Sequence, residues 1–87
     1  MSSVAAQLTV VHRRDCELCD EMLAALARLK TTLQLPAIAV VDVDGDPDLR
    51  RRHGLDVPVL LLDGTVVCRH RLDESELRRL LRHSSVA

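Results

Sequence analysis

The chain contains no aromatic residue, because Phe, Tyr and Trp are all absent from its 87 residues. Single-stranded nucleic acids usually stack on aromatic side chains. A formal net charge of -1 offers no general attraction for phosphate backbones. We therefore expect no nucleic-acid partner, and a hydrophobic core built from Leu, Val, Ala, a single Ile and Met.

Long apolar runs are missing as well. The longest stretches are a handful of residues, such as 57–62, whereas a helix needs about 20 to span a bilayer. The first residues, MSSVAAQLTVVHRRD, start without charge and are interrupted by Gln7 and Thr9, unlike a secretory leader. We expect no membrane partner, a cytoplasmic location and a single domain over residues 1–87, with a core at about 8–81 and a frayed tail at 84–87.

Cysteine is scarce, and its three copies are an odd number. A disulfide framework uses an even number, so this count favours a reducing compartment. Cys16 and Cys19 are separated by two residues. In a reducing compartment such a pair more often exchanges electrons or binds metal than staples the chain, although two ordinary helix-end residues would give the same pattern.

The first half of the chain predicts a strand, a helix and a second strand. Residues 8–12 are short, apolar and β-branched. Asp15 stands where a helix N-cap is expected. One helix face then carries the apolar residues Leu18, Met22, Leu26, Leu29 and Leu33. Residues 38–43 form a continuous apolar run typical of a strand covered on both faces, so a parallel β-α-β unit is expected.

The second half predicts a short helix, a hairpin and a final helix. Asp46 is an expected N-cap, Pro47 the first helical residue and Gly54 a left-handed helix end. Asp63-Gly64 between the strands 59–62 and 65–70 is a strong hairpin signal. Asp73 and Glu76 have the spacing of a capping box. The predicted class is α/β with the order β-α-β-α-β-β-α.

This order resembles the thioredoxin fold, because Cys-x-x-Cys follows the first strand and Val57-Pro58 enters the third. The stretches CELC, DVDGDPDL and DVPVLLLDG are similar to small bacterial glutaredoxin-like proteins of undefined physiological role. The resemblance covers about residues 8–81. It implies a thioredoxin-like, four-stranded mixed sheet with helices on both faces.

The same resemblance implies an activity and its residues. Cys16 would be the attacking thiolate, Cys19 the resolving thiol and Pro58 a cis proline that lines a docking surface with Val57. The implied function is a dithiol oxidoreductase that reduces disulfides of proteins or small molecules. We further expect a monomer that is recycled by an unidentified reductant. The only redox group is the Cys16-Cys19 pair, with no metal.

The sequence departs from the glutaredoxin pattern at three points. No aromatic residue precedes Cys16, no proline lies between the cysteines, and CRHRLDESEL replaces the Gly-Gly and Asp that help glutaredoxins to hold glutathione. The last departure argues against glutathione as cosubstrate, so the expected partner is a disulfide-bearing protein or another small thiol.

Both positively and negatively charged residues lie near the cysteines in the sequence. A helix N-terminus stabilises a thiolate through its free N–H groups and dipole. The nearby carboxylates of Asp15 and Glu17 oppose ionisation of Cys16. The cationic or titratable neighbours favour it, namely His12, Arg13 and Arg14. Our hypothesis is that the pKa of Cys16 is lowered less than in typical glutaredoxins.

Two other classes of function remain open. A metal or iron-sulfur module needs more ligands than one Cys-x-x-Cys pair supplies within one chain. Cys68 is expected opposite Val59 on an edge strand, about 9.5 Å from the strand that leads to Cys16, which is awkward for a shared zinc. Alternatively, the chain is a binding adaptor in which the cysteine pair acts as a redox switch.

Overall fold

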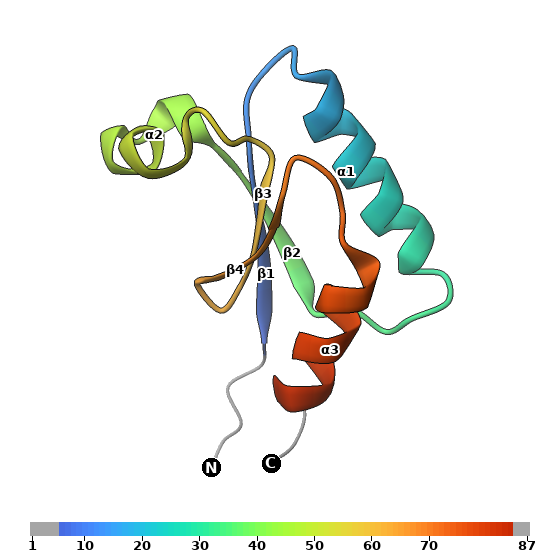
Figure 1. Ribbon diagram of the computed structural model, residues 1–87. Helices are drawn as coiled ribbons and strands as arrows, with labels where there is room; N and C mark the ends of the chain where they lie inside the picture. The colour runs from blue at the N-terminus through green and yellow to red at the C-terminus, as the bar shows by residue number, and fades with distance from the viewer. Residues whose placement is uncertain (1–5, 85–87) are drawn as a thin grey trace.

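The structure is a computed structural model that describes residues 6–84 (Figure 1). Its elements are β1 (Gln7–His12), α1 (Glu17–Leu29), β2 (Ala37–Asp42), the 3-10 helix η1 (Val43–Gly45), α2 (Pro47–His53), β3 (Val59–Leu62), β4 (Thr65–Arg69) and α3 (Glu74–Ser84). This confirms the predicted order, with η1 as an addition. No helix within residues 6–84 has the length and apolar character needed to cross a membrane.

The four strands form one mixed sheet in the order β2-β1-β3-β4. β1 and β2 are parallel, whereas β3 is antiparallel to both β1 and β4. The hairpin turn lies at Asp63 and Gly64, whose φ angles of 49° and 85° fit the predicted tight turn. Asp63 also donates its N–H to the carbonyl of Gln7 and accepts the Gln7 N–H, both at 2.9 Å, so the turn is tied to the start of β1.

Helices cover both faces of the sheet, as predicted. Figure 1 shows α1 and α3 on one side and α2 on the other. The larger buried cluster, on the α1 and α3 side, contains Leu8, Val10, Met22, Leu26, Leu29, Leu60, Leu62, Val67 and Leu77. The smaller one contains Val11, Val43 and Val59. The α/β, thioredoxin-like class is therefore confirmed.

Helix α1 buries a different set of residues from the predicted one. Its buried side consists of Cys19, Met22, Leu26 and Leu29, while Leu18 is only half-buried. The helix ends at Leu29, so Leu33 lies beyond it. The hydroxyls of Thr31 and Thr32 donate to the carbonyls of Arg28 and Leu29, which offers the backbone an alternative to further helix.

Two expectations about the second β-α unit are wrong. β2 is an edge strand and is not covered on both faces, since Val40 is 47% exposed. Gly54 ends α2 with a right-handed φ of -56°. The glycine is needed for space instead, because a Cβ atom there would lie 2.5 Å from the carbonyl oxygen of Arg50.

Candidate redox site

The turn between β1 and α1 places Cys16 at the start of the helix. Cys16 is the N-cap in extended conformation, and its Sγ accepts the Cys19 N–H at 3.1 Å. Asp15, the predicted N-cap, instead has a left-handed φ of 55°. Aspartate suits either role, so the sequence pattern could not separate them. The sulfur atom of Cys16 therefore occupies the position that a capping side chain usually holds.

Cys16 and Cys19 form a disulfide, with their Cα atoms 5.2 Å apart. The two residues differ in exposure. Cys19 is completely buried on the inner side of α1, whereas Cys16 is half-buried. An incoming molecule can therefore reach Cys16 more easily than Cys19.

The Val57-Pro58 peptide bond is cis, as the resemblance implied for Pro58. Val11 pairs with Val59, so the residues just before β3 lie beside the end of β1 that leads to Cys16. Pro58 is buried and Val57 is half-buried. The Pro58 carbonyl accepts the N–H of His70 at 2.7 Å, which ties the segment after β4 to the cis proline.

Arg13 has a clear structural partner. Its guanidinium donates to the carboxylate of Asp44 at 2.8 and 3.1 Å and to the Gly54 carbonyl at 3.0 Å. The hydrogen bond with Arg13 lowers the pKa of Asp44, and the same bond raises the pKa of Arg13. Arg13 thus joins the end of β1 to η1 and to the end of α2.

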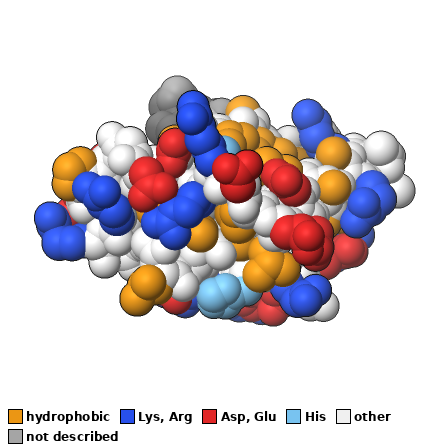
Figure 2. Space-filling model, turned by 90° about the horizontal axis from the view of Figure 1, so that it is seen from above, with side chains coloured by type: hydrophobic (Ala, Val, Ile, Leu, Met, Phe, Trp, Pro, Cys, Tyr) orange, Lys and Arg blue, Asp and Glu red, His pale blue; other side chains and the backbone are white. Residues whose placement is uncertain are grey.

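The other predicted neighbours lie at the same end of the molecule. His12 is the last residue of β1 and is half-buried, while Arg14, Asp15 and Glu17 are exposed. No described residue pairs with the side-chain charges of Arg14, Asp15 or Glu17. Figure 2, which looks down on the upper end of Figure 1, shows acidic and basic side chains interspersed with hydrophobic ones.

The sequence analysis missed two features near the cis proline. His70 has a left-handed φ of 70°, which is uncommon for a residue other than glycine. Leu55, three residues before Pro58, is 96% exposed. Residue type alone predicts neither feature. The one indication in the sequence that the backbone near His70 is unusual was the replacement of the glutaredoxin Gly-Gly by a stretch that contains His70.

Cys68 lies two strands from β1, on the edge strand β4, as predicted. It pairs with Leu60 and not with Val59, because a β-bulge shifts the register between Leu60 and Leu61. Burial raises the pKa of the Cys68 thiol, although the Asp73 N–H donates to its Sγ at 3.4 Å.

The residues of the site do not form a group of metal ligands. Within residues 6–84, no set of three or more His, Cys, Asp or Glu side chains is placed to hold one metal ion. A cluster shared between two copies of the chain would use ligands from both.

Comparisons with known proteins place this geometry in a family. The sequence model of the glutaredoxin-like domain (DUF836) matches residues 7–82. An uncharacterized protein of Mycobacterium tuberculosis is 34% identical over 77 residues, which cover 83% of this chain and 78% of that protein.

Solved structures agree with the fold. The solution structure of protein Ne2328 from Nitrosomonas europaea has a TM-score of 0.78 and 28% identity, and covers 92% of this chain and 95% of that one. Thioredoxin 1 from Thermosipho africanus has a TM-score of 0.57 and 18% identity, with coverage of 90% and 97%. At that identity the likeness to thioredoxin concerns the fold alone.

Proposed function

Because the chain belongs to the family of glutaredoxin-like domains, we propose that it is a thiol-disulfide oxidoreductase that uses Cys16 and Cys19. Its substrates would be disulfides of proteins or small molecules. The observation that carries the proposal is the bonded pair at the start of α1, in which Cys16 is the more accessible residue and Cys19 is completely buried.

The reaction starts from the reduced dithiol. The Cys16 thiolate attacks one sulfur of a substrate disulfide, forms a mixed disulfide and releases the other substrate sulfur as a thiolate. The Cys19 thiolate then attacks Cys16 Sγ, which releases the second substrate thiolate and leaves the Cys16-Cys19 disulfide. The substrate gains two electrons, and an external dithiol or thiol reductant restores the pair.

The surroundings of Cys16 support its role as the nucleophile. In the reduced protein, the Cys19 N–H and the positive end of the α1 dipole would stabilise a Cys16 thiolate. Exposed carboxylates of Asp15 and Glu17 oppose it. Arg13 is engaged with Asp44, so Arg14 remains as the positive group that favours the thiolate. The side chain of His12 lies at the same end of β1. We propose that Cys16 is a moderately activated thiol.

The docking surface would consist of the cis-proline segment. As the resemblance to thioredoxin-like proteins implies, the Val57 backbone would lie beside Cys16. Leu55 adds an exposed apolar side chain to the same segment. This surface suits a protein disulfide or a small thiol. We further propose that the chain acts as a monomer in a reducing compartment such as the cytoplasm, without a resident cofactor.

Cysteine variants test the activity directly. We expect the wild type to reduce both insulin and a small aromatic disulfide, and Cys16→Ser to lose both activities. Cys19→Ser should retain the first attack and accumulate a mixed disulfide on Cys16, which mass spectrometry detects. Cys68→Ser is the matched control and should keep the wild-type rates. Equal rates in Cys16→Ser and the wild type would exclude the proposed chemistry.

The identity of the reductant needs a separate measurement. Equilibrating the protein with glutathione at fixed ratios and counting free thiols would give the potential of the Cys16-Cys19 pair. The replacement of Gly-Gly by the segment around His70 leads us to expect slow turnover with glutathione. Fast turnover with glutathione would contradict that expectation but would leave the dithiol mechanism intact.

A further inference from the structure

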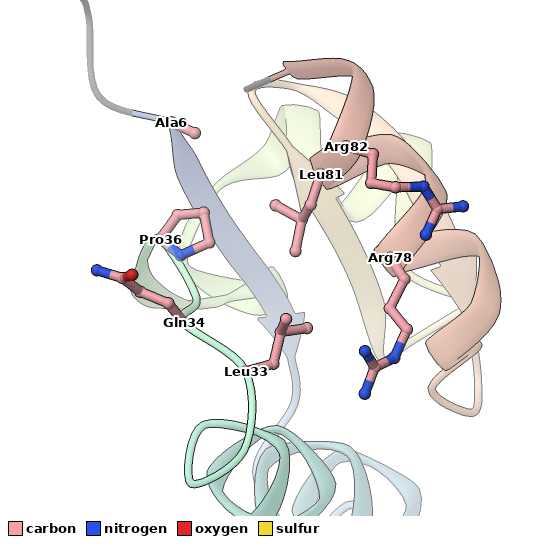
Figure 3. Close-up of a pocket in the computed structure, with 7 residues that line it drawn as sticks. All are labelled: Ala6, Leu33, Gln34, Pro36, Arg78, Leu81 and Arg82. Carbon is pink, nitrogen blue, oxygen red and sulfur yellow. The ribbon is translucent and has the colours of Figure 1, made fainter. Parts of the chain in front are cut away.

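A cavity of about 600 Å³ lies at the other end of the molecule from the cysteine pair (Figure 3). It is formed by the residue before β1, the segment between α1 and β2, and one side of α3. β1 separates it from the turn that carries Cys16, and six residues of strand span about 20 Å. The cavity is therefore distinct from the candidate redox site.

The floor of this cavity is apolar. It is formed by Ala6, Leu33, Pro36 and Leu81. Three of these side chains, those of Ala6, Leu33 and Leu81, also pack against the larger core cluster, so the floor is continuous with the hydrophobic core. A hydrocarbon group placed there would be removed from water against a surface that the fold already holds in place.

Arginine supplies the charge at the wall. Arg78 donates through Nε to Glu74 at 2.9 Å, which fixes one edge of its guanidinium. Within residues 6–84, its two terminal nitrogens have no acceptor. Figure 3 shows the Arg78 side chain extending from α3 toward Leu33, on the opposite side of the cavity. Arg82, one turn later, lines the cavity as well.

We propose that this cavity binds a small amphipathic carboxylate, with its hydrocarbon part on the Leu33, Pro36 and Leu81 floor and its carboxylate on the terminal nitrogens of Arg78. Guanidinium nitrogens match the geometry of a carboxylate and form charge-assisted hydrogen bonds. The volume lies within the range of about 300–1,000 Å³ that small-molecule sites occupy. The absence of aromatic side chains argues against a nucleobase, which would need a stacking partner.

The test uses the full chain with its Cys16-Cys19 disulfide intact, so the result does not depend on the proposed redox activity. Decanoate would be titrated into isotope-labelled protein while amide and methyl NMR signals are followed. We expect saturable shifts at Leu33, Leu81 and Arg78, and none near Cys16. Acetate, which has the carboxylate without the chain, should cause no saturable shifts.

Variants and ligand analogues separate the charge from the apolar contact. Arg78→Gln should weaken decanoate binding about tenfold or more, as expected for loss of a charged hydrogen bond. Arg79→Gln is the matched control, because Arg79 pairs with Glu76 and lies outside the cavity lining; it should bind as the wild type does. Decanol and decyltrimethylammonium should bind at least tenfold more weakly than decanoate.

Three results would overturn the proposal. They are the absence of saturable decanoate binding, equal binding of decanol and decanoate, and an equal loss of binding in Arg78→Gln and Arg79→Gln. Circular dichroism of both variants shows whether they remain folded. If Arg78→Gln does not fold, the decanol comparison on the wild type decides the question.

Discussion

At the scale of single residues, left-handed backbone conformation occurs at turns: one next to Cys16, one in the β3-β4 hairpin and one after β4. Asp15, Asp63 and His70 all have positive φ angles. Aspartate tolerates the left-handed region because its short side chain can bond locally, whereas for other residues with a Cβ atom this region costs about 1–2 kcal/mol. His70 is thus the least favourable of the three. It lies where a hydrogen bond joins the segment after β4 to Pro58.

Introducing a glycine at one left-handed position and removing it from another should change the free energy of unfolding in opposite directions. His70→Gly relieves the left-handed cost but increases the freedom of the unfolded chain, so we expect a net gain of about 0.5 kcal/mol in the free energy of unfolding. Gly64→Ala does the reverse, since its φ is 85° and no atom lies within 4 Å of the new Cβ. We expect it to lose about 1 kcal/mol, purely from backbone conformation.

Urea unfolding followed by circular dichroism measures both changes. A loss of stability in His70→Gly would mean that the imidazole makes a stabilising contact that outweighs its backbone conformation. Insulin reduction by the same variant then shows whether the imidazole also contributes to activity.

Cys68 provides a second prediction for a single residue. Burial raises the pKa of its thiol. The unfolded chain therefore loses this proton first as the pH rises, and the folded state loses stability from about pH 8.5 upward until the folded thiol also ionises. The difference in unfolding free energy between the wild type and Cys68→Ala should accordingly shrink between pH 7 and pH 10.

The pH dependence can be assigned to the Cys68 thiol because the disulfide-bonded Cys16 and Cys19 do not titrate. In the oxidised protein, Cys68 should also react slowly with iodoacetamide at pH 8, and quickly after unfolding. Reaction at the rate of a free thiol in the folded protein would contradict the burial of Cys68.

At the scale of elements, turns and helix starts were predicted correctly from patterns that span only a few neighbouring residues. The Asp63-Gly64 turn has its predicted shape, and Asp46 and Asp73 accept the expected backbone N–H groups of Asp48 and Glu76. These contacts depend on neighbours in the sequence, so the pattern of residue types was enough.

Features that depend on residues far apart in the sequence could not be predicted from such local patterns. The apolar run 38–43 indicates a strand but not whether it lies at the centre or the edge of a sheet. The β4 bulge that places Cys68 opposite Leu60 is likewise a tertiary feature. For the candidate site, the cysteine pair and cis Pro58 followed from resemblance, whereas the binding of Arg13 to Asp44 joins positions 31 residues apart.

The Arg13-Asp44 pair gives a prediction at the element scale, since it joins β1 to η1. Arg13 lowers the pKa of Asp44, so the pair stabilises the folded state above the usual carboxyl pKa of about 4. This contribution should disappear as the pH falls through the folded pKa of Asp44. The difference in unfolding free energy between the wild type and Asp44→Asn should be positive at pH 6 and close to zero at pH 2.

Asp48→Asn is a suitable comparison for this pH dependence. Asp48 pairs with Arg51 and Arg52 of its own helix. It therefore has no role in joining separate elements. A larger effect for Asp48→Asn than for Asp44→Asn at pH 6 would show that Arg13 does not tie the elements together in solution.

At the scale of the whole molecule, the two faces of the sheet are unequal. The buried cluster under α1 and α3 holds nine residues, while the one on the α2 side holds three. A chain of this size is stable by roughly 4–13 kcal/mol in total. Most of that stability must come from the larger cluster, which no aromatic residue reinforces.

Shortening one buried side chain on each side of the sheet should show that the two clusters contribute unequally to the free energy of unfolding. Leu26 is 1% exposed and Val43 0% exposed, so both are core residues. Leu26→Ala should cost about 2–5 kcal/mol, a large part of the total. Val43→Ala removes fewer carbon atoms from a small cluster and should cost about 1–2 kcal/mol.

Because the chain lacks aromatic fluorescence, far-ultraviolet circular dichroism in urea is the appropriate measurement. A greater loss in Val43→Ala than in Leu26→Ala would mean that the α2 side, and not the side that buries Cys19, carries most of the stability.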